Sequence, residues 1–232
     1  MPKIIVTIPT WNESLNIKLL IDEILALKNK DLEIVVADDN SPDGTWKIVE
    51  EISKINKKVH LLHRVTNKGR GLAGIDGFKK AMELGADIIV EMDADFSHHP
   101  RHIPELVNSL QNADVSIGSR FKIGGYDKRG LKRRVLTKGS NAFANIVLGV
   151  NLTDPNSGYR CYKREAMGKI VDKLKAPGPD IVQDVIDKCK INNLKLIEIP
   201  IDFQDRERGE TTKTFKDFIN GAVTTLKLRF SR

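Results

Sequence analysis

The sequence predicts an α/β fold with a mostly parallel central sheet and helices on both of its faces. Short runs of consecutive apolar residues, typical of strands buried on both sides, alternate in the N-terminal half with segments that repeat apolar residues at helical spacing. Such alternation indicates parallel strands, because each parallel connection has to cross the sheet and usually does so through a helix. The chain of 232 residues is long enough for one large domain with a sizeable core.

The predicted elements of the N-terminal half follow one another in a regular order. Strands are expected at 4–8, 34–37, 59–63 and 87–92, and helices at 14–28, 45–56 and 71–84. The first helix places Ile17, Leu20 and Ile24 on one face, and Asn12 precedes it as the predicted N-cap. The loop DDNSPDG after the second strand is rich in turn residues.

The C-terminal half is less regular, with a strand expected at 115–117, a helix at 131–148 and a strand at 194–203. We expect one domain over 1–232, made of a nucleotide-binding half, an acceptor and sugar half, and an amphipathic C-terminal helix, over 1–95, 96–213 and 214–232. That helix either lies in a membrane interface or packs on the sheet. No run approaches the roughly 20 apolar residues of a transmembrane helix, and no secretory signal is recognisable. The two cysteines are expected to be reduced thiols of a cytoplasmic protein.

Positive charge is concentrated in one segment. The chain has a net charge of +7, and residues 120–138 alone contain eight basic residues and one acid. Such a segment predicts a phosphate-bearing partner: a nucleic acid, a lipid headgroup or a phosphorylated substrate. A nucleic-acid-binding segment would interleave aromatic residues with the basic ones, and only Phe121 and Tyr126 do so here. We therefore expect no nucleic-acid partner.

Acidic residues follow two of the predicted strands, at the edge where parallel sheets bind ligands. Asp93 and Asp95 end the strand at 87–92, and their carboxylates suit Mg²⁺ or Mn²⁺ bound to nucleotide phosphates. Asp38 and Asp39 follow the strand at 34–37, where an acid either contacts a ribose or forms an Asx turn. Each motif alone also fits a simple turn. Together with PTWNE after the first strand, they predict a nucleotide site.

Other motifs point away from alternative chemistry. The HHPRH run at 98–102 lacks the ligand spacing of a zinc site, so we interpret it as a polar loop. The sequence contains neither a phosphate-binding G-x-x-x-x-G-K-S/T loop nor a G-x-S-x-G nucleophile motif. The NKGRGLAG stretch at 67–74 is interpreted as lacking the strand-to-helix context of a dinucleotide fingerprint.

Seven motifs occur in the order found in the family 2 glycosyltransferases: PTWNE, DDNSPDGT, NKGRGLAGIDGFKKA, MDADFSHHP, IGSRF, DPNSGYRCYKRE and DRERGETTK. From about residue 3 to 216 the chain resembles this family, and in particular its dolichyl-phosphate mannosyltransferases. The resemblance implies a GT-A type fold. It also implies inverting transfer of mannose from GDP-mannose to dolichyl (polyprenyl) phosphate, with Mg²⁺ or Mn²⁺ as cofactor and a dolichyl β-D-mannosyl phosphate product.

The resemblance also implies roles for individual residues. Those matching the donor-binding positions are Pro9, Trp11, Glu13, Ala37, Asp39, Asp93, Ala94, Asp95, Arg120, Arg206 and Lys213. The matches to metal-binding positions are Asp93, Asp95 and Ser97, and those to acceptor-phosphate positions are Arg120, Arg133 and Thr137. The expected catalytic residues are Asp93, Asp95 and Arg120.

Two positions depart from the family pattern. Trp11 stands where the family usually has Tyr, which keeps an aromatic face but removes a hydroxyl. Lys213 comes one residue later than the usual lysine of the closing loop, and Thr212 occupies the matching position.

The lipid acceptor implies a peripheral protein on the cytoplasmic face of a membrane, the endoplasmic reticulum if the source is eukaryotic, with a small membrane-anchoring subunit as a further partner. Three alternatives remain open from the sequence. The donor would be UDP-glucose in a dolichyl-phosphate glucosyltransferase. A sugar-hydroxyl acceptor would require a general base, for which Asp184 is the obvious candidate. The third alternative is a non-catalytic nucleotide-sugar-binding protein.

Overall fold

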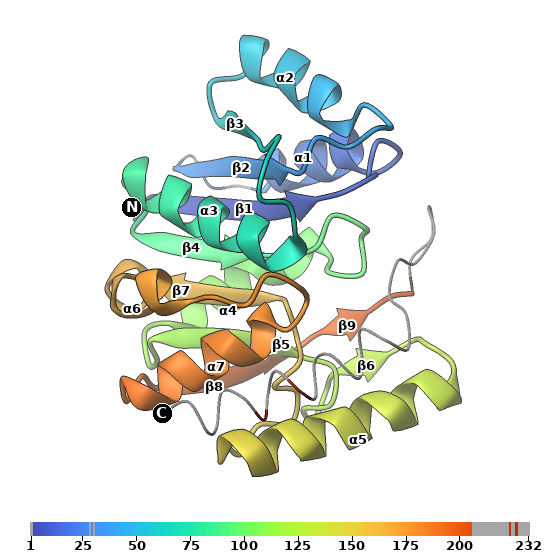
Figure 1. The fold of residues 1–232 in the computed structure, drawn as a ribbon, viewed down its shortest axis with the longest axis vertical. Helices are drawn as coiled ribbons and strands as arrows, with labels where there is room; N and C mark the ends of the chain where they lie inside the picture. The colour runs from blue at the N-terminus through green and yellow to red at the C-terminus, as the bar shows by residue number, and fades with distance from the viewer. Residues whose placement is uncertain (1, 28, 30, 206–222, 224–225, 227–232) are drawn as a thin grey trace.

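The computed structural model describes residues 2–27, 29, 31–205, 223 and 226. A seven-stranded sheet has the strand order β3-β2-β1-β4-β7-β5-β8 (Figure 1). Its strands are β1 (Ile4–Thr10), β2 (Leu32–Asp38), β3 (Val59–His63), β4 (Ile88–Glu91), β5 (Val115–Ser119), β7 (Arg160–Lys163) and β8 (Leu196–Pro200). Within this sheet β7 runs antiparallel to both of its neighbours, and the other strands are parallel to one another. The mostly parallel sheet is confirmed.

Helices cover both faces of the sheet, as predicted. They are α1 (Ile17–Leu25), α2 (Thr45–Ile55), α3 (Arg70–Glu83), α4 (Ile103–Ser109), α5 (Leu131–Leu148), α6 (Arg164–Ile170) and α7 (Ile181–Ile191), with short 3-10 turns at Pro100–His102 and Val171–Lys173. Alternate residues of a strand point to opposite faces. Ile5 accordingly joins the buried cluster under α3, α6 and α7, and Val6 joins the cluster under α1 and α4.

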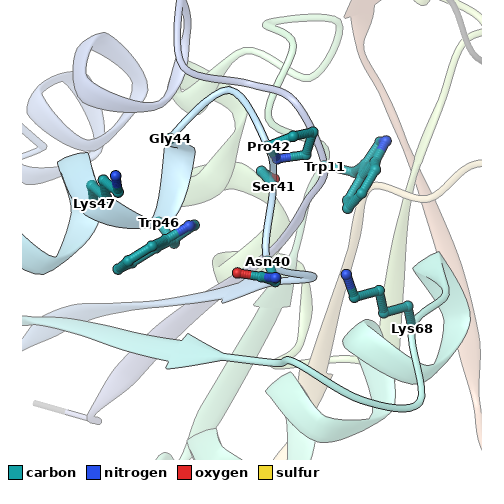
Figure 2. Close-up of a pocket in the computed structure, with 8 residues that line it drawn as sticks. All are labelled: Trp11, Asn40, Ser41, Pro42, Gly44, Trp46, Lys47 and Lys68. Atoms are coloured by element: carbon teal, nitrogen blue, oxygen red, sulfur yellow. The ribbon is translucent and has the colours of Figure 1, made fainter.

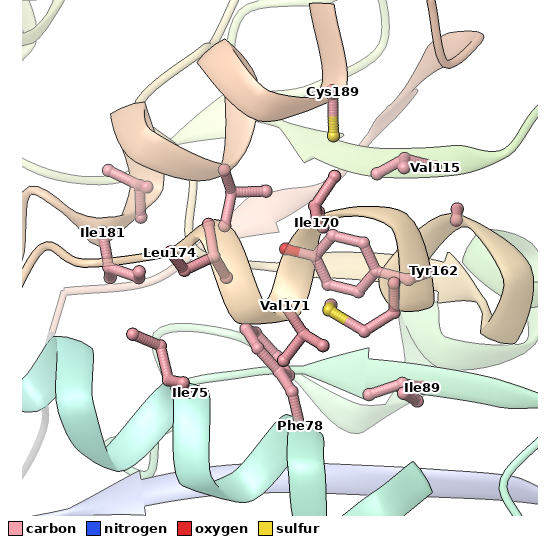
Figure 3. Close-up of a cluster of buried hydrophobic side chains, with 14 of the residues drawn as sticks. Ile75, Phe78, Ile89, Val115, Tyr162, Ile170, Val171, Leu174, Ile181 and Cys189 are labelled. Atoms are coloured by element: carbon pink, nitrogen blue, oxygen red, sulfur yellow. The ribbon is translucent and has the colours of Figure 1, made fainter. Parts of the chain in front are cut away.

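The cluster under α3, α6 and α7 joins the two halves of the chain. Figure 3 shows Phe78 of α3 facing Val171 and Tyr162, with Cys189 of α7 on the opposite side. The rings of Phe78 and Tyr162 meet edge to face with centroids 5.5 Å apart. Because this core is continuous, the strand ends of both halves are held at fixed positions relative to one another.

Both cysteines are buried free thiols, as the prediction of unpaired cysteines requires. Burial raises the pKa of the Cys189 thiol to about 12, and it raises the pKa of Cys161 as well. Both side chains therefore stay protonated at neutral pH and act as core residues.

The predicted N-cap of the first helix is wrong. α1 begins at Ile17 with Asn16 as N-cap, and Asn12 has a φ of +58°. The Asn12 backbone N–H donates to Ser41 Oγ at 3.0 Å, and the Glu13 N–H donates to Thr45 Oγ1 at 2.9 Å. Because side chains of the β2–α2 loop bind these N–H groups, residues before Asn16 form a loop in place of a first helical turn.

Two further sequence interpretations are corrected. The strand expected over 194–203 ends at Pro200, and the chain then forms β9 (Asp202–Phe203), which pairs with β6 (Tyr126–Asp127) in a separate two-stranded sheet. The NKGRGLAG stretch does connect a strand to a helix, because it links β3 to α3. Short strands and loops of this kind follow from tertiary contacts and leave a weak local pattern.

Part of the predicted C-terminal region lies outside the described residues. This applies to Arg206 and Lys213, and of the helix expected over 214–232 only Val223 and Leu226 are described. The boundaries of the three predicted segments stay predictions. Among the described helices, none combines the length and the apolar character needed to cross a membrane.

Candidate active site

The carboxyl ends of the parallel strands lie at one edge of the sheet, and the predicted site residues follow them there. Trp11 and Glu13 follow β1, Asp39 follows β2, and Asp93 follows β4. Arg120 follows β5, which is parallel to β4 although β7 lies between them. Parallel sheets bind ligands at this edge, because successive loops converge there.

An open pocket of about 400 Å³ lies beside the ends of β1 and β2. It is lined by Trp11, Asn40, Ser41, Pro42, Gly44, Trp46, Lys47 and Lys68 (Figure 2). The Trp11 side chain is 42% exposed, and Lys68 Nζ lies 5.4 Å from its ring centroid. Trp46 stacks on His63 with centroids 4.3 Å apart. Exposed aromatic faces next to ammonium groups suit a nucleotide, whose base stacks and whose phosphates are anionic.

Asp38 fixes the loop that carries this pocket. It is fully buried and accepts hydrogen bonds from Thr10 Oγ1 at 2.8 Å, from the Ser41 N–H at 2.8 Å and from Ser41 Oγ at 2.7 Å. The bond to the Ser41 N–H spans three residues, so Asp38 holds the turn of DDNSPDG without forming the predicted Asx turn, which reaches only two residues on. Asp38 therefore holds the loop that lines the pocket in place through its bonds to Thr10 and Ser41.

Asp39 connects β2 to the loop before α3. Its carboxylate pairs with Arg64 and accepts from the Gly69 N–H at 2.7 Å. Burial raises the pKa of Asp39, and these hydrogen bonds and the Arg64 charge partly oppose that effect. The contacts hold the segment with Lys68 beside the end of β1, where it meets Trp11.

The other residues of the predicted donor segment are Pro9, Ala37 and Glu13, and they lie at or just after the ends of β1 and β2. Pro9 pairs with Ala37 in the β1–β2 register, and the Ala37 side chain is buried. Glu13 is also buried, and its Oε2 accepts from Asn16 Nδ2 at 2.8 Å. Glu13 thus stabilises the turn that presents Trp11.

The D-x-D segment follows β4. Asp93 and Asp95 are partly exposed, whereas Ala94 between them is buried. Asp95 Oδ1 accepts from the N–H of the buried Ser97 at 3.1 Å, and the Asp93 N–H donates to His98 Nδ1 at 3.0 Å. Burial lowers the pKa of His98, which favours the neutral ring that can accept this bond. The segment is therefore a shaped loop with two accessible carboxylates.

The residues present fit a divalent ion whose ligands come partly from the protein and partly from a bound substrate. Within the part of the chain that the structure describes, no group of three or more His, Cys, Asp or Glu residues is placed to hold a metal ion. Mg²⁺ and Mn²⁺ in nucleotide sites use one or two carboxylates, and phosphate oxygens and water complete the coordination. Asp93 and Asp95 supply such a pair, with Ser97 held close by its bond to Asp95.

Arg120 is held in a buried bidentate ion pair. Its Nε donates to Asp154 Oδ2 at 2.6 Å and its Nη2 donates to Asp154 Oδ1 at 2.7 Å. Its guanidinium carbon also lies 5.0 Å from the ring centroid of Phe203. Burial works against the charge, but Asp154 outweighs it and raises the pKa of Arg120. The guanidinium thus stays charged in a fixed orientation.

Of the three predicted acceptor residues, Arg133 and Thr137 lie one turn apart on α5, whereas Arg120 follows β5. The Thr137 hydroxyl donates to the Arg133 carbonyl at 2.8 Å, and Arg133 Nη1 donates to Asp205 at 3.0 Å. Thr137 Oγ1 also accepts from Arg129 Nη2 at 3.1 Å. The Arg129 guanidinium binds Asp127 at 2.6 and 2.9 Å and lies 4.8 Å from the Phe203 centroid.

Sequence reasoning counted Arg129 only as part of the basic segment and missed its contact with Thr137. The signal was weak: Arg129 precedes α5, so helical spacing does not relate it to Thr137.

Asp184, the alternative base, is 1% exposed. Its Oδ2 accepts from the N–H groups of Lys175 and Ala176 at 2.7 and 3.1 Å. It therefore serves as a structural anchor of a loop, which disfavours the alternative with a sugar-hydroxyl acceptor.

The chain is similar to known glycosyltransferases in sequence and in fold. The model of glycosyl transferase family 2 matches residues 5–171. The chain is 35% identical to the undecaprenyl-phosphate mannosyltransferase of Micrococcus luteus, over 90% of this chain and 86% of that protein. It is 35% identical to the polyprenol monophosphomannose synthase of Mycolicibacterium smegmatis, over 88% and 78%. It is also 36% identical to the dolichol-phosphate mannosyltransferase of Pyrococcus furiosus, covering 97% of this chain and 64% of that one.

Among solved structures, the chain is similar to glucosyl-3-phosphoglycerate synthase from Mycobacterium tuberculosis. The complex of that enzyme with Mn²⁺, UDP and glucosyl-3-phosphoglycerate has a TM-score of 0.69, at 21% identity, over 99% of this chain and 79% of that one. At this identity the likeness shows the fold, and it confirms the GT-A type architecture.

Proposed function

Because the chain belongs to glycosyltransferase family 2, we propose that it transfers mannose from GDP-mannose to dolichyl or another polyprenyl phosphate. The observation that carries the proposal is the place of Phe203 between the two predicted subsites. Its ring lies 5.6 Å from His98, which supports the D-x-D segment, and 5.0 and 4.8 Å from Arg120 and Arg129. The Phe203 ring thus lies next to the histidine that supports the D-x-D segment and next to two arginines near the predicted acceptor site.

The acceptor chemistry matches this arrangement of cations. A phosphate monoester is already ionised at neutral pH, so the attacking oxygen needs no general base. The site has to reduce the repulsion between two anions and to orient the attack on the anomeric carbon. Arg120 and Arg133 would bind the acceptor phosphate, together with the Thr137 hydroxyl that Arg129 orients. A single displacement inverts the anomeric carbon and yields the β-linked mannosyl phosphate.

The donor's diphosphate would bind at Asp93 and Asp95 through Mg²⁺ or Mn²⁺. When bound there, the ion would neutralise charge on the leaving nucleoside diphosphate. Pro9, Trp11, Glu13 and Ala37 would border the nucleotide, with Asp39 near the ribose. The pocket beside Trp11, with its two indole rings and about 400 Å³, provides room and stacking surface for a nucleotide base.

α5 supports a peripheral position on a membrane, which we propose to be on its cytoplasmic face. Its outer surface exposes large apolar side chains: Leu131, Val135, Leu136, Phe143 and Ile146 are 74%, 61%, 62%, 36% and 81% exposed. Lys132 and Lys138 are exposed on the same helix. Apolar side chains flanked by lysines suit the interface of an anionic bilayer, and each basic residue near it contributes about 1 kcal/mol. The acceptor residues Arg133 and Thr137 on this helix would then lie at lipid headgroup level.

The proposal is tested by following labelled sugar into lipid. Purified protein is incubated with GDP-mannose or UDP-glucose and polyprenyl phosphate in detergent, with and without Mg²⁺ or Mn²⁺. Metal-dependent labelling from GDP-mannose alone is the expected result. Labelling from UDP-glucose would show that the donor is UDP-glucose and not GDP-mannose. No labelling from either donor would contradict the proposed reaction. Repeating the assay with a membrane extract tests for a small anchoring subunit.

A further inference from the structure

A buried ion pair lies directly below the D-x-D segment. Glu91, the last residue of β4, is 1% exposed, and its Oε1 accepts from Arg70 Nη1 at 2.7 Å. Its other oxygen accepts from the Tyr162 hydroxyl at 2.9 Å. A carboxylate buried in a sheet is costly unless it is paired and hydrogen-bonded, and these two partners supply that compensation.

Arg70 extends from this pair to the metal-binding segment. It is the first residue of α3, its side chain is 25% exposed, and its Nη2 donates to Asp93 Oδ1 at 3.0 Å. A Cβ on Gly158 would lie 3.1 Å from Arg70 Nη2, so the glycine leaves room for the guanidinium. Burial opposes the charge of Arg70, but Glu91 and Asp93 outweigh it and raise its pKa. The guanidinium is therefore a permanent cation beside Asp93.

We propose that Arg70, anchored by Glu91, is a positioning residue that fixes Asp93 and adds a resident positive charge to the diphosphate end of the donor site. Its bond to Asp93 Oδ1 neutralises part of the charge of that carboxylate and fixes its orientation. The inference rests on the proposed function, because it takes Asp93 and Asp95 as the diphosphate and metal segment.

This arrangement predicts effects of opposite sign on two ligands. A positive charge near Asp93 weakens binding of a free divalent ion and strengthens binding of a nucleoside diphosphate. Near a partly exposed group, where solvent screens the interaction, one charge changes binding by roughly five- to tenfold. If Arg70 had a purely structural role, its substitution would weaken the binding of both ligands or leave the binding of both unchanged.

The test compares Arg70→Leu/Glu91→Gln with the wild-type chain. The double substitution removes both charges of the pair, so the net charge is unchanged, but the charge lost nearest to Asp93 is that of Arg70, whose Nη2 lies 3.0 Å from Asp93 Oδ1. The glutamine carbonyl at position 91 still accepts from Tyr162. Calorimetric titration measures Mn²⁺ without nucleotide, and then GDP at saturating Mn²⁺. Thermal unfolding confirms that each variant is folded. Arg70→Lys, which keeps the charge, should stay close to wild type in both titrations.

Lys80→Leu/Glu83→Gln is the matched control, because it removes both charges of the exposed pair that Lys80 and Glu83 form at the far end of α3. We expect the double variant at Arg70 and Glu91 to bind Mn²⁺ about threefold more tightly and GDP about threefold more weakly, with no change in the control. Equal values in wild type and double variant, or a loss of both ligands in a folded variant, would overturn the role of Arg70. A wild-type chain that binds neither Mn²⁺ nor GDP would refute the proposed site itself, and this inference with it.

Discussion

The ion pair between Arg120 and Asp154 makes a specific prediction about stability. The Asp154 side chain is fully buried and that of Arg120 is 8% exposed. The carboxylate accepts from the Arg120 backbone N–H, Nε and Nη2, and from Asn141 Nδ2. Asp154→Asn keeps the size of the side chain, but it removes the charge and turns an amide group toward these donors. The arginine is then left buried without its counterion.

Breaking a buried ion pair by neutralising one partner costs about 3–5 kcal/mol. The free energy of unfolding of a native domain is about 5–15 kcal/mol, so this loss is a large part of it. Urea unfolding followed by circular dichroism measures it as a lower transition midpoint with an unchanged slope. Lys18→Ala is the control, since Lys18 and Asp22 form an exposed pair at 2.8 Å and such pairs contribute about 0.3–0.5 kcal/mol. A loss below about 1 kcal/mol in Asp154→Asn would refute this reasoning.

Four further predictions concern catalysis, pH and membrane binding. Asp95→Asn should abolish mannosyl transfer, measured with labelled GDP-mannose, because the metal loses its principal carboxylate. Arg133→Ala should raise the KM for polyprenyl phosphate by about tenfold and leave the KM for the donor unchanged. Burial opposes the charge of Asp127, but hydrogen bonds from Arg129 lower its pKa, so its contribution to stability is lost as the pH falls through that lowered value. Ile146→Glu, at a position 81% exposed, should weaken binding to anionic vesicles severalfold without changing the thermal midpoint.

Each of these predictions has a control or an opposing result. For pH, Asp127→Asn should lose less stability than wild type between pH 5 and pH 2.5 in thermal unfolding, and identical losses would contradict the assignment. For vesicles, Ile55→Glu changes a residue that is 88% exposed on α2, and it should bind like wild type. An Asp95→Asn enzyme with normal turnover would remove the metal from the mechanism. A KM for polyprenyl phosphate in Arg133→Ala equal to that of the wild type would place this residue outside the acceptor site.

The sequence predicted the sheet edge well because its signals were local. Continuous apolar runs located β1 to β4, and the acids after β2 and β4 follow directly from those strand ends. β7 escaped prediction, since Arg160 to Lys163 is a short stretch without periodicity and its antiparallel place depends on β4 and β5. The same reason explains β6 and β9, which are two residues each.

The roles of individual site residues depended on contacts that spacing does not reveal. Arg70 bridges residues 21 and 23 positions away, and Phe203 meets His98 and Arg129 from the far end of the chain. Asp38 and Asp39 are adjacent in sequence, yet one closes a turn and the other pairs with Arg64. The residue types that follow the strands located the site, and long-range contacts determine what each side chain does there.

In the proposed reaction the phosphate of a polyprenyl acceptor attacks the donor sugar without a general base. The most direct test offers the metal-loaded enzyme GDP-[¹⁴C]mannose with polyprenyl phosphate or with the corresponding polyprenol, which lacks the phosphate. We expect mannosylated lipid from polyprenyl phosphate and none from polyprenol. Equal labelling of the two acceptors would contradict a mechanism in which the phosphate is the nucleophile.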